Sequence, residues 1–343
     1  MRKLRNTLYV LTPETYLSVE NENVVIQRDE ERMGQFPLHT LESILYFGYK
    51  GASPALLGAC MEAGVSFCFY TPNGRFLARA AGGVTGNVLL RKEQYRISED
   101  EARSCRIARN MIAGKVYNAR WVLERATRDH PQRVDVDRLK RISQTLADAM
   151  QGIAACEQLE TLRGLEGEAA ARYFEGLGAL ILQSQESFAF HGRNRHPPMD
   201  PVNAMLSFVY TLLAHECRSA LEGVGLDPYV GFLHRDRPGR ASLALDLMEE
   251  MRSPVADRLV LTVINNRLVK PKQFERVENG AIRMDDQARK AILTAWQERK
   301  REEMVHPYLQ EKVPWGLVPH VQATLLARLI RKDLDAYPPL FWK

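Results

Sequence analysis

The segment VSFCFYTPNG, residues 65–74, is followed closely by the turn-rich segment GGVTGN at residues 82–87. The first segment is typical of an apolar strand that ends in a turn, because Pro, Asn and Gly all favour turns. From about Leu89 to the end of the chain, apolar residues recur instead at the spacing of an α-helix. The two segments therefore mark the boundary between a β-rich part and a helical part.

Further short apolar runs precede this boundary and are separated by turn-forming residues. They lie at residues 8–11, 16–19, 24–26 and 44–47. The second and third flank the polar turn ENEN at residues 20–23, which predicts a hairpin, and residues 53–63 predict one short helix. We therefore predict an α+β protein, with a small β-sandwich-like domain at residues 1–88 and a larger all-α domain at residues 89–343.

The composition is that of an ordinary globular protein, with 45% hydrophobic and 26% charged residues. A formal net charge of +5 is compatible with a polyanionic partner but is not evidence for one. No apolar run approaches the ~20 residues that a membrane-spanning helix needs, so we expect no membrane association. The five cysteines are scattered, which indicates reduced thiols and a cytoplasmic location.

A glycine-containing segment of the helical part carries the first candidate site residue. In LRGLEGEAAARYF, residues 162–174, small residues flank Glu166 and would allow a ligand or another backbone to approach closely. Glycine is unfavourable inside a helix, so a packing or functional reason is expected. The alternative is a helix N-terminus, where acidic residues favour the helix dipole.

The segment HGRNRHPPMDP, residues 191–201, displays Arg193 and Arg195 on a proline-rich loop. Guanidinium groups match the oxygens of a phosphate, so this loop suits phosphate binding. The alternative is a surface loop whose arginines pair with local acidic residues. Asp200 followed by Pro201 predicts the start of a helix.

A second loop places His234 directly before a cluster of arginines, which are Arg235, Arg237 and Arg240. A single histidine is more often a core or surface residue than a site residue. Glycines near this loop, at residues 225, 231 and 239, permit tight turns around His234. By the residues alone, a core or surface histidine is still the favoured interpretation of His234.

The segment SLALDLMEEMR, residues 242–252, predicts a helix with Ser242 as its N-cap. At ~100° per residue its apolar side chains share one arc, and Asp246, Glu249 and Glu250 lie on the opposite side. Such an acidic face is either solvated or bound to a divalent cation, which would turn the repulsion between carboxylates into attraction.

Glu166, His234, Asp246 and Glu249 together offer hard oxygen donors and one imidazole. Such donors suit Mg²⁺ or Mn²⁺. A divalent cation near arginines is the combination that phosphodiester chemistry requires. Because spacing alone does not show that distant residues meet in space, the residues by themselves indicate a possible metal–phosphate site and no more.

Four segments resemble the motifs of a known family in order and spacing. They are LEG at residues 165–167, RNRHPPMDPVNA at 193–204, GLDPYVGFLHR at 225–235 and SLALDLME at 242–249. The family is the universal CRISPR-associated endonuclease and integrase of spacer acquisition. NTLYV at residues 6–10 and the chain length resemble its type I-C branch, whereas His196 departs from the pattern, in which a third arginine-like residue is expected.

The resemblance implies a DNA endonuclease and integrase that depends on Mg²⁺ or Mn²⁺ and whose helical domain is catalytic. Carried over by position, Glu166, His234 and Asp246 are the catalytic metal ligands, and Glu249 stands where some relatives have a second acidic ligand. The candidates for binding the phosphates of double-stranded DNA are Arg193, Arg195, Arg235, Arg237 and Arg240.

The resemblance also implies an assembly and a reaction. Such proteins are homodimers through their β domains, and two dimers flank a dimer of a small ferredoxin-fold partner protein in a heterohexamer. The assembly holds a prespacer duplex, whose 3′-hydroxyl attacks a phosphodiester at the edge of the CRISPR repeat in a transesterification.

Two other functions are compatible with the residues. A nuclease that hydrolyses branched DNA would use the same metal site, because water can replace the sugar hydroxyl. A non-catalytic DNA-binding scaffold would need no metal, and its acidic residues would then form a solvated face.

Overall fold

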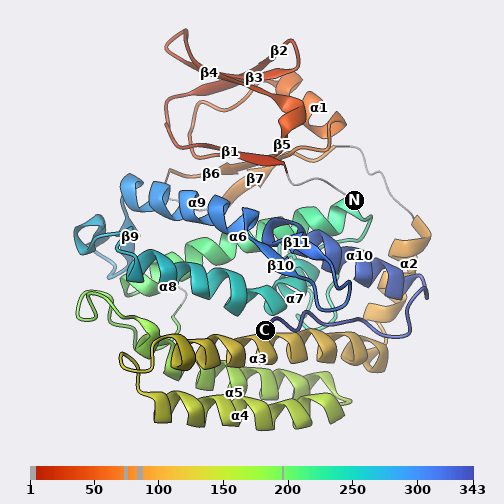
Figure 1. Cartoon of the computed structure of the whole chain (residues 1–343). Helices are drawn as coiled ribbons and strands as arrows, with labels where there is room; N and C mark the ends of the chain where they lie inside the picture. The colour runs from red at the N-terminus through yellow and green to blue at the C-terminus, as the bar shows by residue number, and fades with distance from the viewer. Residues whose placement is uncertain (1–4, 73–75, 83–87, 195–196) are drawn as a thin grey trace. The chain divides into compact units, whose positions relative to one another are not determined.

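The computed structural model describes residues 5–72, 76–82, 88–194 and 197–343. The chain divides into two compact units, Met1–Thr85 and Gly86–Lys343. The first unit is rich in strands and the second is mostly helical (Figure 1). This confirms the predicted α+β fold class.

The N-terminal unit consists of two sheets and one helix (Figure 1). Its elements are β1 (Asn6–Val10), β2 (Tyr16–Glu20), β3 (Asn23–Arg28), β4 (Glu31–Pro37), β5 (Leu41–Tyr46), α1 (Pro54–Glu62), β6 (Ser66–Tyr70) and β7 (Phe76–Arg79). One sheet has the order β1-β5-β6-β7, with β7 antiparallel to β6 and the other pairs parallel. The other sheet, β2-β3-β4, is antiparallel.

Both sheets and α1 share one apolar core, as a sandwich-like arrangement requires. Leu17 and Val24 from the three-stranded sheet, Ile44 and Phe67 from the four-stranded sheet, and Leu56 from α1 are all fully buried in it. The apolar runs predicted from the sequence are therefore the strands that have a buried face. Strand β4 lies outside this prediction because six of its seven residues are exposed.

The predicted hairpin is formed by β2 and β3. Asn21 and Glu22 make its turn, with φ angles of 47° and 59°. Positive φ at both central positions is the conformation that matches the twist of a two-residue hairpin, and asparagine tolerates it well.

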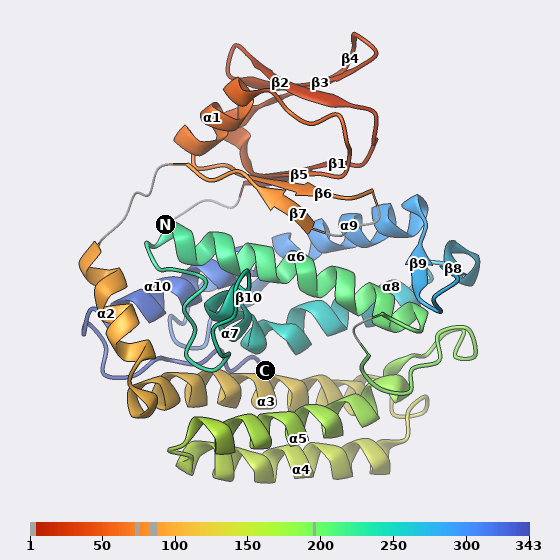
Figure 2. The same cartoon turned by 180° about the vertical axis from the view of Figure 1, so that it is seen from behind.

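The C-terminal unit is built from nine α-helices among the residues that the structure describes. They are α2 (Val88–Ser98), α3 (Glu101–Asp129), α4 (Val136–Ala155), α5 (Leu159–Leu177), α6 (Pro201–Gly223), α7 (Ser242–Met251), α8 (Arg258–Asn265), α9 (Asp286–Arg301) and α10 (Val318–Ile330). In both views α3, α4 and α5 lie side by side (Figures 1 and 2). A π-helical turn, Arg252–Asp257, joins α7 to α8.

This unit is mostly helical, as predicted, but it is not entirely α-helical. Two short antiparallel hairpins interrupt the helices, β8 (Phe274–Arg276) with β9 (Ile282–Met284) and β10 (Glu303–Val305) with β11 (Lys312–Pro314). Each strand has three residues. A run this short is below the length at which alternation in the sequence identifies a strand.

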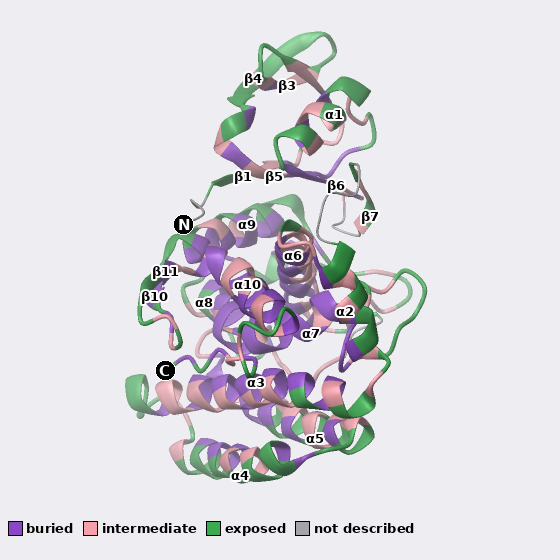
Figure 3. Ribbon diagram, turned by 90° about the vertical axis from the view of Figure 1, so that its right-hand side faces the viewer, coloured by how far each residue is buried: buried purple, intermediate pink, exposed green. Residues whose placement is uncertain are grey.

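Helix α7 lies in the interior of this unit, and all of its residues except Leu245 are buried (Figure 3). Helix α6 begins as predicted, because Asp200 accepts a hydrogen bond from the main-chain N of Asn203 at 2.8 Å and Pro201 is the first helical residue. All five cysteines are buried as free thiols. In the described part of the chain, no helix combines the length and apolar character needed to cross a membrane.

Candidate functional site

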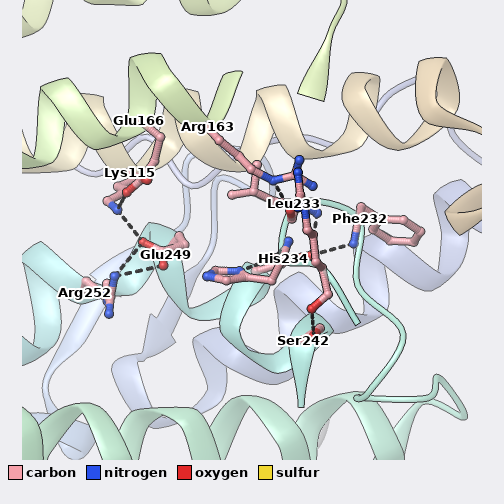
Figure 4. Close-up of polar contacts among 11 residues, drawn as sticks. Lys115, Arg163, Glu166, Phe232, Leu233, His234, Ser242, Glu249 and Arg252 are labelled. Carbon is pink, nitrogen blue, oxygen red and sulfur yellow. Dashed lines mark hydrogen bonds and ion pairs between the residues drawn. The ribbon is translucent and has the colours of Figure 1, made fainter. Parts of the chain in front are cut away.

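Glu166 lies in the middle of α5 and not at a helix N-terminus, so the interpretation based on the helix dipole is wrong. Its carboxylate forms an ion pair with Nζ of Lys115 on α3 (Figure 4). The same Nζ lies 2.7 Å from Oε2 of Glu249 on α7. Lys115 therefore joins two carboxylates that are far apart in the sequence.

Glu249 is a buried carboxylate with two cationic partners. Nη1 of Arg252 donates to both of its oxygens, at 2.9 and 3.1 Å (Figure 4). Burial alone would raise the pKa of Glu249, but the positive charges of Arg252 and Lys115 lower it to about 2. The carboxyl is therefore ionised at neutral pH.

The solvated acidic face considered from the sequence does not exist. Asp246, Glu249 and Glu250 are 1%, 3% and 0% exposed. They also face different partners, because Gln322 Nε2 and Tyr337 Oη donate to Oε2 of Glu250, at 2.6 and 3.0 Å. Burial raises the pKa of Glu250 to about 8, since these neutral donors offset little of the desolvation.

Asp246 fastens the loop that carries His234. Its Oδ1 accepts hydrogen bonds from the main-chain N and from Nδ1 of His234, at 3.0 and 2.6 Å. Its Oδ2 accepts from the main-chain N atoms of Phe232 and Leu233, at 2.6 and 2.9 Å. Gly231 permits this approach, because a Cβ at that position would lie 2.9 Å from Oδ2.

Asp246 and Glu249 therefore have different surroundings, although both are candidate ligands from the sequence. The loop engages both oxygens of Asp246, whereas Glu249 faces a cation. Because Nδ1 of His234 is bound to Asp246, its Nε2 is the ring nitrogen that remains for a ligand. The ring points toward Glu249 (Figure 4). A carboxylate that holds a ligating imidazole in this way is a common outer partner in metal sites.

The donor chemistry of Glu166, His234 and Glu249 fits a divalent cation. The two carboxylates already hold a cationic nitrogen between them, and oxygen donors with one imidazole suit Mg²⁺ or Mn²⁺. Within the described residues, no three His, Cys, Asp or Glu side chains converge closely enough to hold one ion. In this structure the Lys115 ammonium occupies the position between the two carboxylates.

The predicted cap of α7 is wrong. The N-cap position is occupied by Ala241, and Oγ of Ser242 donates to the main-chain O of Arg235 at 3.1 Å. Ser242 therefore fixes the loop beyond His234. Nε of Arg163 on α5 donates to the main-chain O of Leu233 at 2.8 Å and holds the same loop from the other side (Figure 4).

Arg193 contacts helix α6 and does not project freely from its loop. Its Nη1 donates to Oδ1 of Asn203 at 2.6 Å, and its Nη2 donates to Oγ of Ser207 at 3.0 Å. Nδ2 of Asn203 donates in turn to the main-chain O of Gly192 at 2.9 Å. The motif from Arg193 to Asn203 thus forms a loop tied to the start of α6.

The other predicted DNA-binding arginines have varied positions. Arg195 lies outside the described residues, as does His196. Arg235 and Arg237 are exposed, and Arg235 forms an ion pair with Glu160 at the start of α5. Arg240 is half-buried. Arg235 is therefore paired with an acidic residue of α5, while the side chain of Arg237 is exposed.

An open groove of about 980 Å³ runs beside Glu166. Its lining includes Glu166, Gly167, Phe174, Phe190 and Arg193. No atom would lie within 4 Å of a Cβ at Gly167, so the glycine leaves space in the groove and does not serve a close contact between backbones. The expected room for a ligand beside Glu166 is present.

Lys115 and Arg252 are site residues that no motif in the sequence predicts. One signal for Lys115 is the preceding glycine, Gly114, which lies within the long helix α3. A Cβ at Gly114 would lie 3.1 Å from Cγ of Glu250, so the glycine allows α7 to pack closely against α3. Because glycine is unfavourable inside a helix, its presence there can indicate such a contact.

Comparisons with known proteins show the family to which the chain belongs. The family model for CRISPR associated protein Cas1 matches residues 8–298. CRISPR-associated endonuclease Cas1 2 of Rhodospirillum rubrum is 50% identical over 100% of both chains, and CRISPR-associated endonuclease Cas1 1 of Chlorobaculum tepidum is 48% identical over 100% of both. A solved casposase bound to its integration product has a TM-score of 0.85 at 22% identity, covering 99% of this chain and 95% of that one.

The casposase shares the fold, whereas the two endonucleases match the whole chain at about half of its positions. The matched region of the family model also contains every candidate ligand, from Glu166 to Glu249. The resemblance drawn from the four sequence motifs is thereby confirmed at the level of the family. The chain belongs to the family of CRISPR-associated Cas1 endonucleases.

Proposed function

We propose that the chain is a metal-dependent DNA integrase of the type I-C branch. It joins the 3′-hydroxyl ends of a prespacer duplex to a CRISPR repeat by transesterification, with hydrolysis as a side activity. The relatives of equal length are named endonucleases, and the casposase of similar fold is bound to its integration product. One observation carries the proposal. The carboxylates of Glu166 and Glu249 both contact the ammonium group of Lys115, and His234 lies beside them.

Glu166, His234 and Glu249 are the proposed ligands of Mg²⁺ or Mn²⁺, and Asp246 is a positioning residue. When bound, such an ion supplies positive charge that lowers the pKa of the attacking hydroxyl and stabilises the leaving oxygen. Asp246 orients the imidazole of His234 through Nδ1. Arg252 donates to both oxygens of Glu249 and so fixes the position of that carboxylate.

The groove beside Glu166 is the proposed path of the DNA end. Phe174 and Phe190 line it, and their ring centroids lie 6.1 Å apart. Aromatic faces bind unpaired bases of any sequence by stacking. Arg138 and Arg193 also line the groove and supply positive charge for phosphates. We propose that the protein acts on double-stranded DNA as a homodimer, together with a small ferredoxin-fold partner protein.

The test is strand transfer by the purified protein. A labelled duplex and a supercoiled plasmid that carries the repeat are incubated with Mn²⁺, and joined product is resolved on a gel. Glu166→Ala, His234→Ala and Glu249→Ala should each abolish joining while duplex binding persists. Glu168→Ala, an exposed change on the same helix as Glu166, is the matched control and should join normally.

Asp246→Asn distinguishes a positioning residue from a ligand. The variant should lower the affinity for Mn²⁺ by about 10–100-fold without eliminating binding, as loss of an outer partner does. Normal joining by all three alanine variants would end the assignment of the metal site. Nicked plasmid without joined product would instead identify the protein as a nuclease that hydrolyses DNA.

A further inference from the structure

The side chain of Lys115 lies between Glu166 and Glu249. These three residues come from three different helices, α3, α5 and α7. The ammonium of Lys115 contacts one oxygen of each carboxylate, and the lysine side chain is 10% exposed. An ammonium in this position makes the charge-assisted hydrogen bonds that a metal ion would replace. The lysine therefore competes for the same oxygen atoms as the metal ion of the proposed function.

The two carboxylates that contact Lys115 are balanced in charge by Lys115 and Arg252. Glu166 and Glu249 contribute two negative charges, and Lys115 and Arg252 contribute two positive charges. Without Lys115, the metal-free protein would hold two carboxylates with one cationic partner, and Glu249 is 3% exposed. Unpaired charge at a buried position is costly, so the lysine stabilises the metal-free site.

A divalent ion cannot share this space with the ammonium. Two cations in contact with the same buried oxygens would repel each other strongly, because screening by water is weak there. The lysine is attached by a flexible chain of four carbons, so it can withdraw while the carboxylates stay. A small cavity of about 50 Å³ adjoins it and is also lined by Tyr210 and Asp257, whose oxygen atoms can receive an ammonium.

We propose that Lys115 is a built-in cation, which holds the two carboxylates together in the metal-free protein and leaves them when the metal ion binds. This inference rests on the metal site of the proposed function. It has two consequences that run in opposite directions. The lysine raises the stability of the metal-free protein, and it lowers the affinity for the metal ion, because each binding event must break its two contacts.

The experiment compares Lys115→Met with the wild-type chain, because methionine keeps an unbranched apolar side chain and removes the charge. Calorimetric titration gives the Kd for Mn²⁺, and thermal unfolding is followed in EDTA and in Mn²⁺. Lys115→Met should bind Mn²⁺ at least about tenfold more tightly. It should also have a lower Tm in EDTA and a larger rise in Tm on addition of Mn²⁺.

Lys300→Met is the matched control. Lys300 is also buried, and its Nζ lies 2.7 Å from Oε1 of Glu216, away from the candidate site. Lys300→Met should lower the Tm by the same amount in EDTA and in Mn²⁺, and it should leave the Kd for Mn²⁺ unchanged. Lys115→Arg keeps the positive charge and should not tighten the binding of Mn²⁺.

The outcomes separate the inference from the proposed function. If the wild type binds Mn²⁺ and Lys115→Met binds it no more tightly, the role of Lys115 is wrong and the metal site stands. If neither protein binds Mn²⁺ while both are folded, both proposals fail. Should Lys115→Met fold in Mn²⁺ and not in EDTA, the inference is supported, because the ion then replaces the lysine. Lys115→Gln carries the same expectations and decides the case if the methionine variant folds in neither condition.

Discussion

Gly164 and Gly167 lie three residues apart on α5, on either side of the ligand candidate Glu166. Both are exposed, and no atom would come within 4 Å of a Cβ at either position. Gly167 lines the groove beside Glu166, whereas Gly164 does not. The pair therefore separates the effect of a glycine on the helix from its effect on the groove.

Replacing Gly167 by Leu should obstruct the groove, whereas replacing Gly164 by Leu should not. Both changes remove an unfavourable helical glycine and should raise the free energy of unfolding by up to about 1 kcal/mol. Strand transfer measured over a range of duplex concentrations should show a higher KM for Gly167→Leu alone. Equal KM values for the two variants would show that the DNA end takes another path.

Asp246 and Glu249 show what the sequence can and cannot specify for a single residue. Their type and their spacing of three residues are visible in the sequence, and both therefore become candidate ligands. What separates them is which atoms of distant segments they meet, namely the 232–234 loop for one and Lys115 for the other. Apart from the glycine that precedes it, Lys115 has no local sequence pattern, because its contacts arise from the packing of α3 against α5 and α7.

Helix α7 places two glutamates side by side in opposite protonation states. Cations surround Glu249 and lower its pKa to about 2, while burial raises the pKa of Glu250 to about 8. Gln322 and Tyr337 bind Glu250 as neutral groups, so these hydrogen bonds do not offset the cost of burying a full negative charge. The neutral carboxyl is the form that suits the interior.

The raised pKa of Glu250 makes stability depend on pH. Below about pH 4.5, the ordinary pKa of a glutamate carboxyl in an unfolded chain, both states hold the proton, and the stabilising effect is complete. Between about pH 4.5 and 8 the folded state retains a proton that the unfolded chain releases, so the free energy of unfolding falls as pH rises. The slope from this group approaches about 1.4 kcal/mol per pH unit at most.

Glu250→Gln removes this titration while it keeps a neutral side chain of similar shape. Thermal unfolding in EDTA from pH 5 to pH 9 should show a shallower decline of Tm for the variant than for the wild type. Parallel Tm curves would show that Glu250 keeps an ordinary pKa in the folded protein.

Features that depend on residues within the same segment could be predicted from the sequence. Features that depend on contacts with segments far along the chain could not. Asp200 and Pro201 specify the start of α6 by themselves, and the apolar runs specify β2, β3, β5 and β6. The helical wheel of α7 places its acidic residues on one side of the helix. It does not show which other segments of the chain pack against that side. In the structure α3, α10 and the 232–234 loop cover that side, so the expected solvated face is buried.

At the scale of the whole molecule, the net charge of +5 is spread over 47 basic and 42 acidic residues. Many of the basic residues form ion pairs, as Arg331 does with Asp333 at 3.2 Å. The affinity for DNA therefore depends on which arginines face the duplex and not on the total charge. Arg237, exposed on the loop that follows His234, is the clearest such candidate.

Arg237→Ala should weaken binding to duplexes of any sequence and should reduce the slope of log Kd against log salt by about 1. Arg331→Ala, which removes the same charge elsewhere in the C-terminal unit, should leave the slope nearly unchanged. Fluorescence anisotropy over a series of salt concentrations measures both. Equal changes of slope would indicate a general effect of net charge.

The attachment of the 232–234 loop to Asp246 has a consequence for how such proteins can diversify. Three of its four hydrogen bonds come from main-chain N–H groups, which every residue except proline provides. Substitutions farther along the loop, at positions 235–240, leave these anchors untouched. The side chains at these positions can therefore change in evolution without moving the imidazole of His234, which stays attached to Asp246.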